Sequence, residues 1–299
     1  MKFWLSLVAV RETEQLPELA RFAEELGFHG VMVGDHLIWP AHIETPYPYS
    51  PDGKIFVPPD TPWPDPWILF AHLGAITRRL YFASNIYLAA LRDPLTVAKS
   101  VATAAVLTEG RVVCGVSAGW LKEEYEAAGV DFEERGRRLD ETLVVMKKLL
   151  SGEMVKHEGP LFRFEGIMRP APAQPVRIWC GGAAAPAMRR AARNDGWLPL
   201  PMTVAQTDTA LAAIRIMRRD AGLPQTGFEV GLPLAEPVTQ AAADAVEELG
   251  VHDLVVIAPW LASPWDITSW LESGDDMSHL AVKKKALQRY ADAVLRKVR

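Results

Sequence analysis

The chain of 299 residues is long enough for two small domains or one large α/β barrel. Its composition, 49% hydrophobic and 23% charged, is that of an ordinary globular enzyme, and its net charge of −5 argues against a nucleic-acid-binding protein, which needs a basic face. No apolar run approaches the roughly 20 residues that cross a bilayer, so we expect no membrane span.

The first ten residues have the apolar character of a signal-peptide core. Arg11 and Glu12 follow directly, without a small-residue cleavage site, so residues 3–10 are predicted to form the first strand. Cys114 and Cys180 lie in predicted strands, and we expect buried free thiols in a reducing compartment, which predicts a cytoplasmic protein. No Cys/His cluster has metal-ligand spacing, so no metal site is expected.

Apolar periodicity then predicts an amphipathic helix over residues 14–26, closed by Gly27, and a second strand over residues 30–34 that ends at Asp35-His36. A long segment rich in proline and aromatic residues follows, from residue 37 to residue 64. It is too long for an ordinary connection and too aromatic for a disordered linker, which predicts an active-site lid.

The middle of the chain continues the alternation of helices and strands. Asp65 and Asp93 are each followed by proline, a pattern typical of a helix N-terminus, and they predict helices through residues 76 and 107. The remaining predicted elements are strands 80–87 and 111–117, helices 121–128 and 133–150, and a hairpin over residues 154–164 with an H-E-G-P turn.

The second half repeats the same unit. The predicted strands are 176–180, 196–200, 228–234 and 254–257, and the predicted helices are 184–193, 204–221, 239–249 and 276–298. Eight strand–helix pairs without a composition break predict a (β/α)8 TIM barrel, a single domain over residues 1–299, with insertions after strands two and four. A doubly wound sheet is the alternative.

The fourth strand ends in the most informative turn of the chain. Ser117, Ala118 and Gly119 are small enough to let a ligand approach the backbone, and Trp120, Glu123 and Glu124 open the next helix. Free amides at such a turn suit a phosphate. A tight turn that is small for packing alone is the alternative.

In a barrel, function sits at the carboxyl ends of the strands. These predicted ends carry two Gly/Ala turns, the pair Asp35-His36 and several tryptophans, but no second carboxylate opposite Asp35. A glycosidase pair is therefore not indicated. The chain also lacks a G-x-S-x-G elbow and a Walker loop.

Four blocks of sequence carry a family resemblance over residues 19–249. They are G-F-H-G-V-M-V-G-D-H-L, L-R-D-P-L-T-V-A-K, the run from E-G-R-V-V-C-G-V-S-A-G-W to R-G-R-R-L-D-E, and P-V-R-I-W-C-G-G-A-A-A. In this order and at these distances, the chain resembles the luciferase-like, flavin- or deazaflavin-dependent oxidoreductases of the bacterial luciferase superfamily. The D-H-L variant is most similar to the subgroup that binds the deazaflavin coenzyme F420.

The resemblance implies a cofactor site assembled from the ends of three strands. In the family, the third strand ends in a cis peptide behind the cofactor ring, here in Ser84-Asn85-Ile86, although the usual pattern is richer in glycine and threonine. The cofactor phosphate lies between the fourth-strand turn, here Ser117-Ala118-Gly119-Trp120, and the fifth-strand turn, here Gly181-Gly182-Ala183.

The resemblance also implies that Asp35 and His36 lie beside the ring. Imidazole can give or take a proton near neutral pH, so His36 is the candidate catalytic residue, and a ring that only holds a loop is the alternative. Asp35 is expected to fix His36 or bond to the cofactor. The family's sugar-phosphate dehydrogenases place a glutamate where Trp120 stands here, which argues against their acid–base chemistry.

Two further sets of residues have weaker patterns. The tryptophans in or near predicted loops are expected to pack in the lid or core, or to form a wall for a planar ring or apolar substrate, with Trp39 and Trp260 as substrate-binding candidates; the set is Trp39, Trp63, Trp67, Trp260, Trp265 and Trp270. The helical spacing of Arg135, Arg138, Asp140 and Glu141 indicates a salt-bridged surface or a loop clamp.

Together these observations predict an oxidoreductase that transfers a hydride between F420 and a small organic substrate. One alternative is an FMN-dependent monooxygenase that uses oxygen, and another is a barrel that binds a flavin or ligand without turnover. The resemblance and the apolar helices also predict a homodimer.

Overall fold

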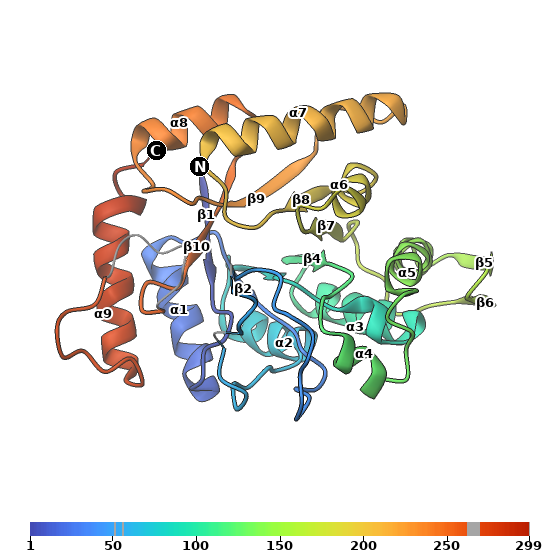
Figure 1. The fold of residues 1–299 in the computed structure, drawn as a ribbon, viewed down its shortest axis with the longest axis horizontal. Coiled ribbons are helices and arrows are strands. Elements are labelled where there is room, and N and C mark those ends of the chain that lie inside the picture. The colour runs from blue at the N-terminus through green and yellow to red at the C-terminus, as the bar shows by residue number, and fades with distance from the viewer. Residues whose placement is uncertain (51, 56, 262–269, 299) are drawn as a thin grey trace.

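The computed structural model describes residues 1–50, 52–55, 57–261 and 270–298 (Figure 1). Eight parallel strands close into a barrel in the spatial order β1-β10-β9-β8-β7-β4-β3-β2, which confirms the predicted fold class. These strands are β1 (Lys2–Ser6), β2 (Gly30–Val33), β3 (Tyr81–Ser84), β4 (Val112–Val116), β7 (Arg177–Gly181), β8 (Gly196–Leu198), β9 (Glu229–Pro233) and β10 (Asp253–Ile257).

Helices connect the strands and cover the outside of the barrel (Figure 1). They are α1 (Leu16–Leu26), α2 (Pro66–Ile76), α3 (Pro94–Leu107), α4 (Lys122–Ala127), α5 (Arg135–Leu150), α6 (Ala185–Ala192), α7 (Val204–Asp220), α8 (Gln240–Glu248) and α9 (Leu280–Tyr290), with short helical turns η1 (Thr13–Gln15), η2 (Ala89–Leu91) and η3 (Ala291–Leu295). Across the described ranges, none of them combines the length and the apolar character that crossing a bilayer requires.

The predicted helix starts at Asp65 and Asp93 are confirmed. The Asp65 carboxylate accepts hydrogen bonds from the first-turn amides of α2, and Asp93 does the same for α3. In both helices proline occupies the first turn, where its missing N–H costs no hydrogen bond. Both helices therefore begin where local chemistry dictates.

Two tryptophans fill the lumen of the barrel. Trp4 on β1 and Trp179 on β7 are 1% exposed and pack edge to face, with ring centroids 5.6 Å apart. A Cβ added at Gly30 would collide with Trp4, and one added at Gly196 or Gly231 would collide with Trp179. Glycines at these strand positions thus leave room for the two indole rings.

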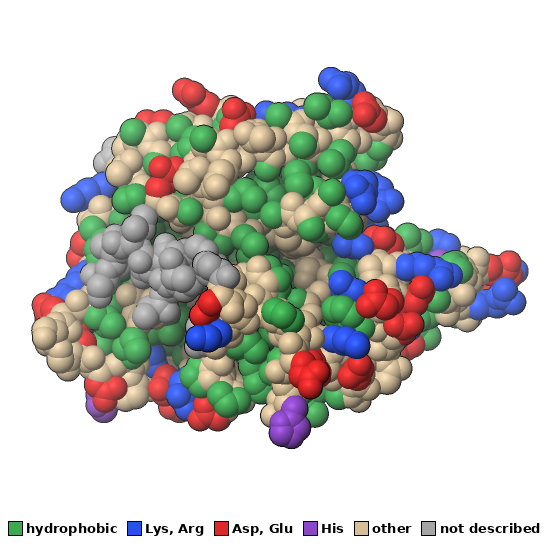
Figure 2. Space-filling view, viewed as in Figure 1, with side chains coloured by type: hydrophobic (Ala, Val, Ile, Leu, Met, Phe, Trp, Pro, Cys, Tyr) green, Lys and Arg blue, Asp and Glu red, His purple; other side chains and the backbone are tan. Residues whose placement is uncertain are grey.

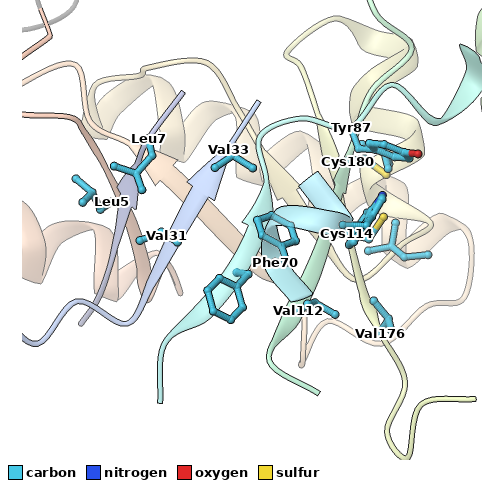
Figure 3. Close-up of a cluster of buried hydrophobic side chains, with 14 of the residues drawn as sticks. Leu5, Leu7, Val31, Val33, Phe70, Tyr87, Val112, Cys114, Val176 and Cys180 are labelled. Carbon is cyan, nitrogen blue, oxygen red and sulfur yellow. The ribbon is translucent and has the colours of Figure 1, made fainter. Parts of the chain in front are cut away.

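A second apolar layer lies between the strands and the surrounding helices. Figure 3 shows Leu5, Val31 and Val112 on the strands, with Phe70 of α2 packed toward them. Cys114 and Cys180 lie in this layer as buried free cysteines, as predicted, and burial raises the pKa of both thiols. They behave as small apolar side chains.

A β-hairpin projects from the body of the molecule beyond α5 (Figure 1). Its strands are β5 (Met154–Glu158) and β6 (Arg163–Ile167), so the hairpin exists, but the predicted end at residue 164 was wrong. The predicted H-E-G-P turn was also wrong at its start, because His157 and Glu158 belong to β5. The amides of Leu161 and Phe162 donate to the Glu141 carboxylate instead of to a partner strand.

Several barrel strands are shorter than predicted at their carboxyl ends, whereas β10 ends at the predicted residue and β7 one residue later. The first stops at Ser6 rather than residue 10, and the third stops at Ser84 rather than residue 87. Apolar character continues past both ends, but the chain there leaves the regular ladder and forms the rim above the barrel. The last predicted helix, residues 276–298, is likewise shortened to α9 followed by a π-helical turn.

Candidate active site

A cavity of about 780 Å³ opens at the carboxyl ends of the strands. The face drawn in Figure 2 is hollowed near its middle, and hydrophobic side chains border the hollow. Residues at or just after the strand ends line the cavity, namely Ser6, Gly34, Asp35, Asn85, Ile86, Ser117, Gly181, Leu198, Pro233 and Ile257. The ends of all eight barrel strands are represented, so the cavity is the mouth of the barrel.

The two Gly/Ala turns predicted for a phosphate lie next to each other. They follow β4 and β7, which are paired neighbours, and Ser117, Gly119, Trp120, Gly181 and Gly182 all line the cavity. Ala118 and Ala183 belong to the same turns but are not among the lining residues.

The backbone of both turns is built from conformations and contacts that small residues permit. Gly119 and Gly182 have φ angles of 70° and 105°, which L side chains rarely adopt. A Cβ at Gly181 would lie 3.1 Å from the Ile86 side chain. The Trp197 indole donates to the Gly182 carbonyl at 2.7 Å and holds that turn in place.

Unpaired backbone amides give this corner its capacity for an anion. Within the described residues, the amides of Ala118, Trp120 and Ala183 donate no hydrogen bond, and α6 begins immediately after the second turn. The first turn leads only to α4, a helix of six residues whose dipole is small, so at this turn the free amides contribute more than the helix dipole. This backbone fits a phosphate group.

The end of β3 contributes the floor of the cavity beside these turns. The Asn85–Ile86 peptide is cis, as the family resemblance implied, and both residues line the cavity. Ser84 is fully buried, and its hydroxyl exchanges hydrogen bonds with the backbone of Gly115 on β4. It lies outside the cavity lining and joins the two strands.

Asp35 is engaged by protein groups on both of its oxygens. Arg92 donates to them at 2.7 and 2.8 Å, and the Leu88 amide donates at 3.0 Å. Asp35 is 5% exposed, and the Arg92 guanidinium also lies over the Tyr87 ring. Asp35 therefore fixes the segment after the cis peptide to the end of β2. None of these hydrogen bonds involves His36.

His36 is held by a glutamate that no sequence motif indicated. Its Nδ1 lies 2.9 Å from Oε2 of Glu124, a residue of α4 that is fully buried. The other oxygen of Glu124 accepts from the Leu37 amide at 2.6 Å and the Ile38 amide at 3.4 Å. In the sequence, Glu123 and Glu124 marked only the start of a helix, because no local pattern reveals that Glu124 faces a residue 88 positions away.

The adjacent Glu123 holds the lid segment further along. Its Oε1 accepts from the amides of Glu44 and Thr45 at 2.8 and 2.9 Å. These bonds lower the pKa of Glu123 against the opposing effect of its burial. Two consecutive carboxylates of α4 thus anchor the start of residues 37–64, directly after the turn that carries the free amides.

Aromatic rings form the wall of the cavity on the lid side. Trp39 and Trp63 stack with an interplanar angle of 10°, and His36 lies edge-on to both. Trp120 packs edge-on against Tyr47 of the lid, and the deeply buried Trp260 also lines the cavity. The predicted residues Trp39 and Trp260 therefore share one cavity with His36.

The other tryptophans singled out in the sequence have different surroundings. Trp67 is a core residue of α2, and Trp270 packs against Tyr290 of α9. Trp265 lies outside the described residues. Of the whole set, the cavity lining includes Trp39, Trp63 and Trp260.

Cationic side chains that line the cavity are paired with protein carboxylates. Arg11 bonds to Asp60, and Lys283 bonds to Glu12 and, at 2.8 Å, to the Gln15 amide oxygen. Residues 262–269, outside the described part of the chain, contain no lysine or arginine in their sequence. In the parts of the chain that the structure describes, no cluster of three or more His, Cys, Asp or Glu side chains could hold a metal ion.

Comparison with known proteins places this geometry in a family. The model of the luciferase-like monooxygenase family matches residues 4–295. An uncharacterized protein of Mycobacterium tuberculosis is 32% identical over 281 residues, which cover 94% of each chain. An F420-dependent glucose-6-phosphate dehydrogenase of Nakamurella multipartita is 31% identical over 208 residues, 67% of this chain and 57% of the relative.

A solved structure has the same fold. The coenzyme F420 dependent tetrahydromethanopterin reductase from Methanopyrus kandleri superposes with a TM-score of 0.72 over 100% of this chain and 99% of its own, at 15% identity. The likeness extends over the whole barrel.

Proposed function

The chain belongs to the luciferase-like monooxygenase family, and from that membership we propose that it is an oxidoreductase that transfers a hydride between the deazaflavin coenzyme F420 and a small, uncharged organic substrate. The observation that carries the proposal is the joining, in one cavity, of two amide-lined turns, the His36 imidazole and an aromatic wall. The F420-dependent relative supports the choice of cofactor.

The residues of the two turns would hold the cofactor phosphate. The amides of Ala118, Trp120 and Ala183 point to no protein acceptor, and the glycines leave room for the backbone to approach the phosphate. Asn85 and Ile86 would support the ring from the floor of the cavity. When bound, the deazaflavin supplies a ring carbon that accepts or donates a hydride.

The protein contributes a proton carrier and a site that excludes water. His36 lines the cavity, and its Nε2 makes no hydrogen bond within the described residues. In the oxidation of an alcohol it would accept the hydroxyl proton as the hydride leaves the carbon, and in the reverse direction it would return that proton to the carbonyl oxygen. The aromatic residues of the lid keep the reacting atoms away from bulk water.

The pairing of the cavity cations argues for an uncharged substrate. The cofactor phosphate would occupy the free amides of the two turns, so a phosphate or carboxylate on the substrate would depend on an arginine or lysine side chain. Arg11 and Lys283 are already engaged by Asp60 and Glu12. Trp39 and Trp63 offer instead a flat apolar surface. We therefore propose an alcohol, ketone or similar apolar compound, in contrast to the phosphorylated sugar of the Nakamurella relative.

Binding and hydride transfer test the proposal separately. The purified protein is titrated with F420 and with FMN, and binding is followed by fluorescence. Reduction of F420 is then followed by absorbance with neutral alcohols and with phosphorylated sugars. We expect tight binding of F420, and turnover with neutral alcohols at least a hundredfold more efficient than with phosphorylated sugars.

The alternatives give different results in the same assays. Tight FMN binding without F420 binding, together with oxygen-dependent turnover, would identify an FMN-dependent monooxygenase. Tight binding of either cofactor without hydride transfer to any acceptor would identify a barrel that binds its ligand without turnover.

A further inference from the structure

Glu124 makes three contacts that cannot all be explained by packing. Its carboxylate is fully buried, accepts from two backbone amides through Oε1, and faces His36 Nδ1 through Oε2. Burying a carboxylate is costly unless hydrogen bonds compensate, and here each oxygen has a donor. The amides alone would fix the start of the lid, so the bond to His36 is an additional feature.

The contact with Glu124 determines which nitrogen of His36 carries hydrogen. A carboxylate is an acceptor only, so Nδ1 must donate, and the neutral ring then presents the Nε2 lone pair. Nδ1 and Nε2 flank the same ring carbon, and their hydrogen-bonding directions diverge, so a partner at Nδ1 leaves Nε2 accessible; His36 itself lines the cavity. The neighbouring charged groups, Asp35 and Arg92, are satisfied by each other and leave Glu124 as the ionisable partner of the ring.

We propose that Glu124 is a positioning residue that fixes His36 in the Nδ1–H tautomer, so that Nε2 can accept the substrate proton. This inference rests on the proposed function for the identity of the reaction. In that reaction the O–H bond of the alcohol would break with transfer of its proton to Nε2, and the C–H bond would break with transfer of its electron pair, as a hydride, to a bound deazaflavin. Glu124 stabilises the imidazolium that forms, as a buried carboxylate does for a catalytic histidine.

A glutamine at position 124 separates this role from the structural one. Its amide oxygen can still accept from the Leu37 amide, so the tether of the lid is retained. The amide NH2 then occupies the place of Oε2, 2.9 Å from His36 Nδ1, and can only donate there. The variant Glu124→Gln should therefore move the imidazole hydrogen to Nε2 and remove the lone pair from the cavity.

Glu123 offers the matched control. It is the preceding residue of the same short helix, it is also a carboxylate that accepts from two lid amides, and it makes no contact with His36. Glu123→Gln also removes one negative charge and also keeps an oxygen that accepts from the lid amides, but it does not alter the contact with the His36 imidazole. Any effect seen only in Glu124→Gln belongs to the contact with the ring.

The first measurement does not depend on turnover. The protein is labelled with 15N-histidine, and the signal of His36 among the seven histidines is assigned by its loss in His36→Ala. Long-range 1H–15N correlations distinguish the two neutral tautomers. We expect the Nδ1–H form in the unmodified protein and in Glu123→Gln, and the Nε2–H form in Glu124→Gln. The Nε2–H form in the unmodified protein, or an unchanged tautomer in Glu124→Gln, would overturn the proposal.

The second measurement uses the assay of F420 reduction. We expect kcat to fall by a factor of about 100 or more in Glu124→Gln, with F420 affinity and KM within about twofold of the unmodified protein. Glu123→Gln should keep its kcat. A changed tautomer with unchanged kcat would refute the positioning role. A protein that turns over no substrate with either cofactor would instead refute the proposed function, and the spectra would still decide what Glu124 does to His36.

Discussion

Several residues at the mouth of the barrel contribute to the site by leaving space or a hydrogen-bonding atom unoccupied by other protein groups. Gly181 leaves space beside Ile86, and Gly182 adopts a backbone conformation that a side chain would strain. His36 leaves Nε2 without a protein partner because Nδ1 is engaged by Glu124. The ligand-binding capacity of this corner therefore depends on a few small or fixed groups.

Gly182 provides the first prediction at this scale. If F420 is the cofactor, as proposed, Gly182→Ala should weaken its binding at least tenfold, because a residue with a positive φ gains a Cβ and the turn with the free amides must shift. Gly250→Ala is the control, since Gly250 has a φ of 81° and nothing within 4 Å of an added Cβ. Both variants should lose about 1–2 kcal/mol of stability. Fluorescence titration and urea unfolding measure the two effects, and equal losses of affinity would contradict the assignment.

The sequence predicted the residues of this corner unevenly. The turns after β4 and β7, His36 and Asp35 could be identified because small residues or a D-H pair follow a buried strand. Glu124 and Arg92 could not, because their partners lie 88 and 57 positions away and only the closed barrel brings them together. Pairing of that kind is a property of the tertiary structure, so local sequence patterns do not contain it.

At the scale of elements, α5 and the hairpin β5–β6 show how an excursion is fixed to the barrel. Glu141 of α5 accepts hydrogen bonds from His157 Nε2 and from the amides of Leu161 and Phe162. These bonds lower the pKa of Glu141 although its burial acts in the opposite direction. Of the two roles predicted for this stretch of α5, Glu141 has that of a loop clamp.

Removing this clamp should loosen the hairpin and leave the barrel intact. In Glu141→Ala, three donors lose a charged acceptor, which is worth about 1.5–3 kcal/mol for each bond of this kind. Amide hydrogen exchange of residues 154–167 should accelerate at least tenfold, while the barrel strands keep their protection. Glu158→Ala, at an exposed ion pair with Lys156, should change neither. Uniform acceleration across both regions would show that the clamp supports the whole fold.

The presence of a helix or strand could be predicted from the sequence better than the residues at which it begins and ends. The helix starts at Asp65 and Asp93 follow from capping chemistry that operates within a few residues, and the structure confirms both. Strand ends at Ser6 and Ser84 depend on where the neighbouring strands stop, which the apolar run alone does not reveal. The hairpin was mispredicted for a different reason, because Glu141 captures the amides of Leu161 and Phe162 just before β6 and no local pattern reveals that contact.

For the molecule as a whole, the environment of His29, which directly precedes β2, makes the free energy of unfolding depend on pH. His29 stacks on Tyr81, with ring centroids 4.6 Å apart, and lies edge-on to Trp4. Burial, together with the charge of Lys2, lowers the pKa of His29 to about 4. In the unfolded chain this histidine has a pKa of about 6.5. The native state therefore disfavours the protonated ring.

This difference predicts the direction of the pH dependence. Between pH 6.5 and about 4 the unfolded chain binds more protons than the native protein, so stability is complete above pH 6.5 and decreases as the pH falls. Between pH 7.5 and 5.5, the unfolding free energy should fall by about 1 kcal/mol through His29. His29→Phe, which keeps the stacked ring, should lose this dependence, and His42→Gln on the exposed lid should keep it. Urea unfolding at the two pH values decides between them.

The whole-molecule predictions from the sequence differ in their support. Eight parallel strands confirm the barrel, because the strand–helix alternation is a global pattern that survives errors at individual ends. The homodimer and the cytoplasmic location stay predictions. The residues that line the cavity come from distant parts of the chain, from Ser6 to Lys283, so the lining could be predicted only where a strand end marked it.

The meeting of Trp4 and Trp179 in the lumen has a consequence for the order of events during synthesis. Trp4 emerges from the ribosome with the first strand, but Trp179, the ring that packs against it, belongs to β7. Gly231, which leaves room for Trp179, belongs to β9. The barrel closes only when β10 pairs with β1, and Asp253 of β10 accepts from the Trp4 indole, so a nascent chain that ends before β10 leaves the lumen open. Such chains should bind to chaperones that recognise apolar surface, and release should coincide with the appearance of β10.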